Sequence, residues 1–276
     1  MPAYVILGGT GKVGRRLTRL LERDGHRARA ASRRTPIRFD WSDDSTWSSA
    51  LEGADGIFIV GPGSATDWSE LLHRLLDVAA EAGVAHAVLL SARGVEFHPG
   101  GAVDMAERTL RSGPLMWTIL RPAHFAQNFT EAMFAPVDGR IVAPVGDGAE
   151  PFIDVDDLAE VAAVVLTDRG HDNKTLALSG PEAITFADAA DTLREISSAP
   201  VLFVDEADDA HVDRLRAAGT PEGYIRWRMA MLRGIRSGAD AYTSDGVAHV
   251  LGRPATTFRA WAIREATHLG VAHRTE

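Results

Sequence analysis

The chain has 276 residues, of which 45% are hydrophobic, and a formal net charge of −9 at pH 7. This composition supplies an ordinary folded core, and a net negative charge spread along the chain disfavours nucleic acid as a partner because phosphate binding needs a clustered basic surface. The absence of cysteine excludes disulfides, thiolate nucleophiles and cysteine-ligated metals. Since the sequence has no apolar run long enough for a bilayer and enters a strand pattern at Tyr4 without a leader-like segment, we expect a cytoplasmic protein that does not bind membranes.

The first half of the sequence alternates short apolar runs with helical patterns. Strands are predicted at 4–7, 27–32, 37–40, 56–60, 87–91 and 117–121, and helices at 13–25, 45–51, 69–83 and 102–112. Such alternation is typical of a parallel, doubly wound sheet with helices on both faces. The predicted fold class is therefore α/β.

The second half, after residue 121, follows a looser pattern. Helices are predicted at 154–166, 185–197, 208–218, 222–235 and 257–268, and short strands at 175–178 and 201–204. No linker separates the halves. We therefore predict a core over residues 1–150 and a smaller, mostly helical C-terminal portion over residues 151–276, built onto the core.

A glycine-rich turn joins the first predicted strand to the first predicted helix. Gly8, Gly11 and Gly14 follow the spacing G-x-x-G-x-x-G in a strand–turn–helix context typical of Rossmann-type dinucleotide sites. There the glycines allow a tight turn, close approach of a pyrophosphate and close packing of the helix, whose N-terminus favours phosphate. We predict that Gly8, Thr10, Gly11, Lys12, Val13 and Gly14 bind a dinucleotide; the alternative is a glycine-rich turn without a ligand.

The end of the second predicted strand indicates which dinucleotide is bound. NAD-dependent enzymes usually have an acidic residue there for the ribose 2′-hydroxyl, whereas this chain has Arg33 and Arg34. Two guanidinium groups suit a 2′-phosphate, so we predict NADP(H) in preference to NAD(H), with solvated surface arginines as the alternative. Further cofactor contacts are expected at the carboxyl ends of strands, namely Asp40, Trp41, Val60, Gly61, Pro62, Ser91 and Pro122.

Several segments resemble the NmrA-like, atypical branch of the extended short-chain dehydrogenase/reductase group. They are the glycine turn, Leu120-Arg121-Pro122 with Phe125 and Asn128, and the segment 152–159. The resemblance narrows to festuclavine synthase-like proteins of the ergot alkaloid family and extends over nearly the whole chain. The residues that carry this narrower resemblance are segments 39–43, 45–47, 178–182 and 251–254 with Phe258. The resemblance implies a Rossmann core, NADPH and reduction of an iminium or enone-like substrate.

The proton donor typical of that group is missing. Ordinary short-chain members use a serine with Tyr-x-x-x-Lys; Ser91 lies where the serine is expected, but with Glu107 as the family's helix glutamate the tyrosine and lysine positions fall at Pro99 and Val103. Hydride addition to a ketone builds negative charge on oxygen and gains from an acid, whereas addition to a preformed iminium needs no proton. The sequence therefore fits iminium reduction, or a binder without chemistry.

If an acid is needed, several residues near the carboxyl ends of strands are candidates. They are Asp104, Glu96, His98 and His124. Asp104 also fits a first-turn helix stabiliser, and Glu96 and His98 fit solvated loop residues. His124, with Phe125 and Asn128, is expected to contact the substrate, and Trp227, Met229, Met231 and Leu232 fit either a cap over a flat substrate or ordinary core. No metal-binding spacing is visible among the histidines.

The function predicted from these features is an NADPH-dependent reductase of a small cyclic or aromatic metabolite of iminium, enone, ketone or quinone type, acting as a monomer or homodimer. A second hypothesis is an NADP(H)-sensing regulatory protein without catalysis. A third is a non-redox lyase or isomerase on the same fold.

Overall fold

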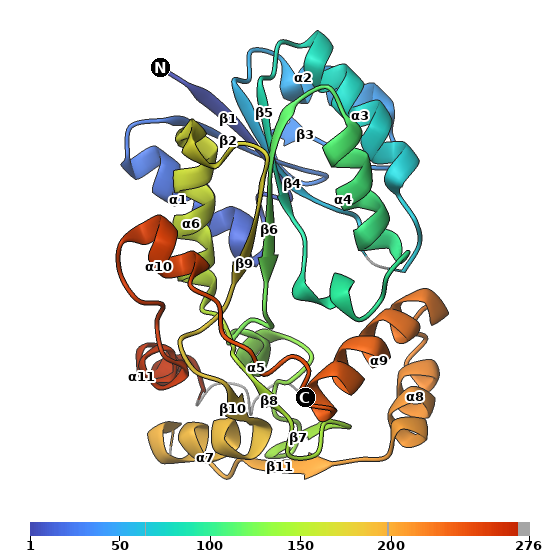
Figure 1. Ribbon diagram of the computed structural model, residues 1–276, viewed down its shortest axis with the longest axis vertical. Helices are drawn as coiled ribbons and strands as arrows, with labels where there is room; N and C mark the ends of the chain where they lie inside the picture. The colour runs from blue at the N-terminus through green and yellow to red at the C-terminus, as the bar shows by residue number, and fades with distance from the viewer. Residues whose placement is uncertain (64, 198, 270–276) are drawn as a thin grey trace.

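The computed structural model describes residues 1–63, 65–197 and 199–269, and a seven-stranded parallel sheet forms its centre (Figure 1). The strand order is β3-β2-β1-β4-β5-β6-β9. The strands are β1 (Ala3–Leu7), β2 (Arg27–Ser32), β3 (Ile37–Arg38), β4 (Gly56–Val60), β5 (His86–Leu90), β6 (Met116–Pro122) and β9 (Lys174–Leu178). All six strands predicted in the first half are confirmed, and the strand predicted at 175–178 becomes the seventh of the same sheet.

Helices cover both faces of this sheet, as a doubly wound α/β fold requires (Figure 1). One face carries α1 (Lys12–Arg23) and α6 (Val155–Thr167), with α10 (Gly246–Leu251) against α6. The other face carries α2 (Trp47–Leu51), α3 (Ser69–Glu81) and α4 (Ala102–Ser112). The central strand β1 is apolar throughout because its alternating side chains enter a separate core on each face.

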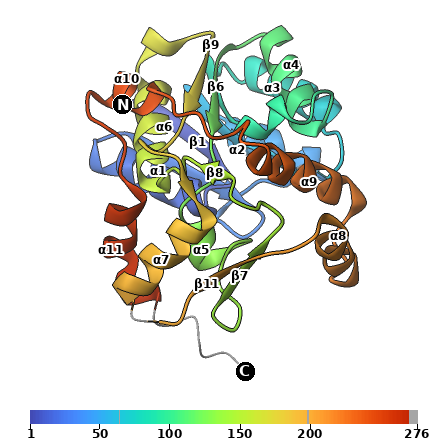
Figure 2. The same cartoon turned by 60° about the horizontal axis from the view of Figure 1, so that its bottom comes forward.

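The remaining elements gather at the end of the sheet where β6 runs into α5 (Figure 1). They are α5 (Asn128–Glu131), β7 (Arg140–Ala143), β8 (Ala149–Glu150), β10 (Ile184–Thr185), α7 (Phe186–Ser197), β11 (Leu202–Asp205), α8 (Asp208–Ala217), α9 (Glu222–Arg236) and α11 (Phe258–Leu269). Elsewhere in the chain are the short 3-10 turns η1 (Asp44–Thr46), η2 (Arg93–Glu96) and η3 (Arg169–His171). Strand β11 pairs with β7 in parallel, and β10 pairs with β8 antiparallel. Both views place α8 and α9 on the side of α3 and α4, and α7 and α11 on the side of α1 and α6 (Figures 1 and 2).

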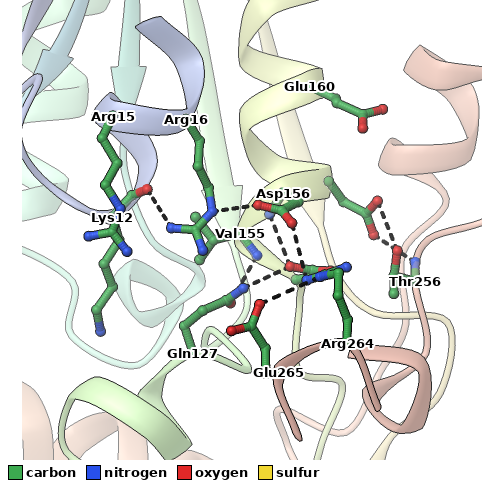
Figure 3. Close-up of polar contacts among 12 residues, drawn as sticks. Lys12, Arg15, Arg16, Gln127, Val155, Asp156, Glu160, Thr256, Arg264 and Glu265 are labelled. Atoms are coloured by element: carbon green, nitrogen blue, oxygen red, sulfur yellow. Dashed lines mark hydrogen bonds and ion pairs between the residues drawn. The ribbon is translucent and has the colours of Figure 1, made fainter. Parts of the chain in front are cut away.

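A polar seam ties the sheet layers to this end of the molecule (Figure 3). Arg16 of α1 pairs with Asp156 of α6. The side chain of Asp154 caps α6 by accepting from the N–H of Asp156 (3.0 Å) and also accepts from Arg264 of α11 (2.7 Å), so the helix predicted over 154–166 begins at a capping aspartate. Strand β9 belongs to the sheet and helix α6 to the layer that covers it, yet both follow residue 150. The sheet therefore extends beyond the predicted core, and a division at residue 150 stays a prediction.

No helix in the described ranges is long and apolar enough to cross a membrane.

Candidate active site

The glycine turn between β1 and α1 has the geometry of a phosphate cradle. Gly8 has φ +79° and its N–H donates to the carbonyl of Ala31 (3.0 Å), while the N–H of Gly11 donates to the carbonyl of Gly8 (2.9 Å). A Cβ at Gly14 would lie 2.4 Å from that same Gly8 oxygen, so the turn can form only with glycine there. Helix α1 begins at Lys12 without a side-chain cap or an acidic residue in its first turn, which leaves its first N–H groups available for an anion.

A cavity of about 650 Å³ opens beside this turn, at the carboxyl ends of β1, β2 and β4. Nine of the residues predicted to contact the cofactor line it: Gly8, Thr10, Arg33, Arg34, Asp40, Trp41, Val60, Gly61 and Pro62. Ser32, Phe39 and Ser42 complete the lining. Gly11 and Gly14 shape the turn behind it and Val13 is buried in the core, whereas Ser91 and Pro122 line a different cavity.

Charged side chains of both signs stand at the rim of this nucleotide cavity. Arg33 and Arg34 are exposed, and their guanidinium groups form no hydrogen bond or ion pair with the described part of the chain. Asp40 accepts from the N–H (3.0 Å) and the hydroxyl (2.7 Å) of Ser42, and these two bonds lower the pKa of its carboxyl group. The two unpaired cations therefore remain free to bind an anion.

Trp41 lines the nucleotide cavity, and Trp68 packs behind it. The indole N–H of Trp41 donates to the carbonyl of Val60 (3.1 Å), and its ring packs edge-on against Trp68 at 5.3 Å between centroids. A Cβ at Gly61 would come within 2.3 Å of the Trp68 ring. Trp41 thus both packs in the structure and lines the cavity, so its two interpretations are compatible.

A second, smaller cavity of about 170 Å³ lies at the carboxyl ends of β5 and β6. The predicted residues Ser91, Pro122, His124, Phe125 and Asn128 line it, together with Trp227 and Met231 of α9 and with Ala92, Arg93, Gly94, Ala123, Met133 and Asp240. The amine of Lys12 donates to the side-chain oxygen of Asn128 (3.2 Å), which joins the glycine turn to the wall of this second cavity. Met229 and Leu232 belong to the hydrophobic core.

Ser91 is held by a buried ionic group. Its hydroxyl donates to the carboxylate of Glu107, which is fully buried and also pairs with Arg121 (2.6 Å) and Arg111 (2.8 Å). Burial opposes ionisation, but the hydrogen bonds from Arg121 and Ser91 keep the pKa of Glu107 below its usual value. Because its proton is committed to Glu107, the hydroxyl of Ser91 offers a substrate an acceptor and not a proton.

The other candidate acids from the helix α4 region do not line the cavity. Asp104 accepts from the N–H of Gly100 (2.8 Å) and from Arg108 (2.7 Å). Burial opposes ionisation, but these two contacts lower the pKa of Asp104, so Asp104 performs the local helix-start role weighed above. Glu96 accepts from the hydroxyl of Tyr242 (2.8 Å), and His98 lies outside the cavity lining.

His124 is the candidate acid that the structure does bring into the second cavity. Its backbone N–H (2.9 Å) and its Nδ1 (3.0 Å) both meet one carboxylate oxygen of Glu150. A carboxylate only accepts, so this contact assigns the Nδ1 proton to His124. Its Nε2 is buried and has no hydrogen-bond partner within the described residues, and it is therefore the free polar atom of this ring.

Besides Glu150, two further charged residues that sequence reasoning missed lie in this group with His124. Asp240 is 1% exposed and Arg93 is 1% exposed. Arg93 donates to the carbonyl of Tyr242 (2.8 Å) and meets Asp240 at 3.3 Å. Burial and the neighbouring Glu150 raise the pKa of Asp240 to about 8, and Arg93 only partly opposes this.

No local sequence pattern indicated that Arg93 and Asp240 would lie near His124. Arg93 and Asp240 are 147 positions apart, and Asp240 lies in an irregular segment after α9. His124, Glu150 and Asp240 offer side-chain atoms within 4.8 Å of one another. The guanidinium of Arg93 already supplies the positive charge beside these carboxylates, so we interpret the group as an ionic network.

The model of the NAD(P)H-binding family matches residues 8–169. The chain is 30% identical to the uncharacterised oxidoreductase YesF of Bacillus subtilis, over 96% of this chain and 95% of that protein. It is 28% identical both to an NAD(P)H azoreductase of Xenophilus azovorans (97% and 99% covered) and to festuclavine dehydrogenase of Aspergillus fumigatus (95% and 97% covered).

Solved structures agree on the fold. A quinone oxidoreductase of Escherichia coli that depends on NADPH superposes with a TM-score of 0.78 at 22% identity, covering 95% of this chain and 98% of that one. The negative transcriptional regulator NmrA, solved with NAD, superposes with a TM-score of 0.77 at 16% identity, covering 100% and 98%. The predicted α/β, Rossmann-type fold is confirmed.

The predicted relationship to festuclavine enzymes is also confirmed, although other reductases are equally similar, so no single substrate stands out among the relatives. The prediction of an NAD(P)H-dependent oxidoreductase is confirmed at the level of the family. The chain therefore belongs to the NAD(P)H-binding family.

Proposed function

We propose that this protein is a reductase that uses NADPH to reduce a small cyclic or aromatic compound of iminium, enone, ketone or quinone type. The observation that carries this proposal is the adjacency of two different cavities along one edge of the sheet. One has a phosphate cradle and unpaired arginines. The other is mostly apolar and contains an oriented histidine, and Lys12 and Asn128 join the two.

The residues of the nucleotide cavity fit an NADPH molecule. The cradle fits a pyrophosphate because only glycine leaves room at position 14. Arg33 and Arg34 would bind the 2′-phosphate, and they support NADP(H) over NAD(H) because neither guanidinium forms an ion pair with a carboxylate among the described residues. When bound, the reduced nicotinamide supplies a hydride.

The residues of the second cavity would hold the substrate. Trp227 and Met231 give it an apolar wall that excludes water, and Ser91, fixed by Glu107, offers a hydrogen-bond acceptor. His124 also lines this cavity, and its Nε2 is buried without a hydrogen-bond partner among the described residues. A mostly apolar site with few polar groups is typical of small-molecule binding.

A sensor of the NADP(H) state is the second candidate, and the similarity of the fold to the regulator NmrA favours it. A sensor needs only the nucleotide cavity, whereas this chain also has an open second cavity with a histidine in it. The enzyme is therefore our first choice. A lyase or isomerase would share both cavities but would show no loss of reduced cofactor.

One experiment separates the reductase from the two candidates that do not consume NADPH. The protein is mixed with NADPH and, in turn, menadione, 2-cyclohexenone and an N-methyl-3,4-dihydroisoquinolinium salt, and the absorbance of the reduced nicotinamide is followed. The reductase consumes NADPH with at least one of them. Tight NADPH binding by calorimetry without turnover of any of the three would favour the sensor, and an unchanged melting temperature with both dinucleotides would contradict every candidate.

A further inference from the structure

Asn128 carries a free amide group in the wall of the second cavity. It is the first residue of α5, it is 7% exposed, and it lines that cavity. Its side-chain oxygen Oδ1 accepts from the amine of Lys12 (3.2 Å). Its nitrogen Nδ2 retains accessible surface and has no hydrogen-bond partner in the described ranges. A residue that is otherwise buried therefore keeps an accessible N–H donor at the cavity wall.

The contact with Lys12 decides which way the amide of Asn128 faces. An ammonium group only donates, so the atom that it meets is the amide oxygen, and Nδ2 is turned away from it. The side chain of Lys12 extends away from the start of α1 to make this contact (Figure 3). The backbone holds Asn128 from both sides, since its N–H donates to the carbonyl of Phe125 (2.9 Å) and its own carbonyl accepts from Phe134 (3.0 Å). The donor is therefore oriented by the protein itself.

The other side chains of this wall offer no free and accessible donor in the part of the chain that the structure describes. Each N–H or O–H group that they carry is either buried or already hydrogen-bonded; the residues are Ser91, Arg93, His124, Trp227 and Asp240. The hydroxyl of Ser91, for example, donates to Glu107 and can only accept from a substrate. Nδ2 of Asn128 is therefore the accessible side-chain donor of this cavity.

We infer that Asn128 is a catalytic residue that donates a hydrogen bond from Nδ2 to the carbonyl oxygen of a ketone, enone or quinone, and that Lys12 is its positioning residue. A donor aimed at the atom where negative charge develops stabilises the transition state without giving up its proton. A preformed iminium ion has no lone pair for this donor and develops no negative charge. This inference rests on the proposed function and narrows its substrate class.

The step balances without an acid from the protein. A carbon of the substrate accepts a hydride from the reduced nicotinamide, which is thereby oxidised, and the π electron pair moves onto the carbonyl oxygen. The hydrogen bond from Nδ2 of Asn128 strengthens as that oxygen becomes negative, while the N–H bond stays intact. Water then gives the oxygen its proton, and the hydroxide enters the solvent. A cavity without the tyrosine and lysine of ordinary short-chain members can therefore reduce a carbonyl group.

Asn128→Asp removes the donor and keeps the shape of the side chain. The carboxylate retains the contact with Lys12 but has only acceptor atoms. The kcat for menadione and for 2-cyclohexenone should fall by at least about 100-fold, the usual worth of such a donor, and the rate with the N-methyl-3,4-dihydroisoquinolinium ion, which takes up a hydride alone, by less than about threefold. Asn173→Asp, at an exposed position before β9, is the matched control and should change none of these rates.

Infrared spectroscopy reads the hydrogen bond directly. With NADP⁺ in place of NADPH, bound 2-cyclohexenone is not reduced, and a hydrogen bond to its oxygen lowers the carbonyl stretching frequency. This frequency should be lower in the wild type than in Asn128→Leu, whose side chain has a similar size but neither donates nor accepts. The affinity for NADPH in calorimetry should be the same in both proteins, which separates the loss of the donor from a loss of folded protein.

Lys12→Met tests the positioning role, and Lys12→Arg is its rescue. Without the amine the amide of Asn128 is free to rotate, so at saturating NADPH the kcat for menadione should fall by about tenfold, the worth of one hydrogen bond. The rate with the iminium should not change, whereas a merely structural defect would lower the rates with all probes. Lys12→Arg retains a donor and should recover most of the kcat for menadione.

The outcomes separate the inference from the function on which it rests. Wild-type turnover of the iminium without either carbonyl probe overturns the inference and leaves a reductase, as do equal losses with all three probes in Asn128→Asp. An unchanged carbonyl frequency in Asn128→Leu also overturns it, and this measurement decides if the wild type reduces the carbonyl probes alone. Wild-type turnover of none of the three probes, with NADPH binding intact in calorimetry, overturns the proposed function itself.

Discussion

The two cavities lie along the same edge of one sheet, but they are built in opposite ways. The nucleotide cavity is lined by four short stretches within the first 62 residues, and its charged side chains are at the surface. The second cavity draws its lining from segments between residues 91 and 240, and charged side chains of its surroundings are buried. A nucleotide needs backbone amides and surface cations, whereas a reaction needs ionisable groups removed from water.

This difference predicts where each cavity is vulnerable. Dinucleotide binding in the nucleotide cavity should be sensitive to displacement of the backbone. It should tolerate changes of side-chain charge, which should alter only the preference between NADP(H) and NAD(H). The second cavity should be sensitive to the loss of single buried charges, because an ion left without its partner in the interior is costly.

The largest effect is expected for Glu107→Ala, which removes the buried carboxylate under Ser91. Arg121 and Arg111 lose their common partner, so the free energy of unfolding should fall by about 3 kcal/mol, measured by urea denaturation at pH 7. Glu160→Ala is the control, because Glu160 makes an exposed ion pair with Arg253 and should cost less than about 1 kcal/mol. Equal losses for the two variants would show that burial of the charge does not matter.

Gly14→Ala should have the next largest effect, and it acts on the other cavity. The added Cβ would lie 2.4 Å from the Gly8 oxygen and 2.7 Å from the Gly9 Cα, so the cradle must move. Relieving such an overlap costs about 1–3 kcal/mol, and we expect NADPH to bind about 100-fold more weakly by calorimetry. The control Gly170→Ala, whose new Cβ would find its nearest neighbour at 3.4 Å, should bind as the wild type does. Unchanged affinity in Gly14→Ala would remove the glycine turn from the site.

The same contrast explains what the sequence could predict. The strands of the sheet and the turn at Gly8 follow from local patterns, because each is specified by residues adjacent in the chain. The strand at 175–178 was visible, but its place beside β6 depends on the whole chain. Short strands such as β8 lack a periodic pattern of their own and exist only by pairing with a distant partner.

The candidate site divides in the same way. Nine predicted cofactor residues line one cavity, whereas Glu150, Arg93 and Asp240 were missed because their meeting depends on tertiary packing alone. Asp104 was a candidate because it follows a strand end, yet its contacts are the local ones of a helix start. A site built from residues close together in the chain can be predicted from the sequence, whereas a site assembled from distant segments cannot.

A smaller effect is expected on the affinity of the nucleotide cavity for NADP⁺ relative to NAD⁺. Replacing both Arg33 and Arg34 with alanine should weaken NADP⁺ binding by about 10-fold to 100-fold, the worth of one or two charge-assisted hydrogen bonds, and leave NAD⁺ binding unchanged in calorimetry. Arg38→Ala is the matched control, since Arg38 pairs with Asp43 and does not line the cavity. Equal weakening of both dinucleotides would mean that the two arginines act on the pyrophosphate and do not select the 2′-phosphate.

The last prediction is a dependence of stability on pH that belongs to the second cavity alone. The pKa of Asp240 is about 8 in the folded protein, whereas the ordinary pKa of an aspartate is 3.8, so between these values the folded state holds a proton that the unfolded state releases. Stability contributed by this group is therefore full below pH 3.8 and is lost as pH rises to about 8, by at most about 1.4 kcal/mol per pH unit. Asp240→Asn carries no such proton, and the unfolding free energy of the wild type relative to this variant should decline between pH 5 and pH 8 and then level off.

The exposed Asp245→Asn, on the same segment, should give a constant difference from the wild type over that interval. Parallel curves for wild type and Asp240→Asn would mean that Asp240 is ionised in the folded protein, and the second cavity would then lack the buried proton that distinguishes it from the nucleotide cavity.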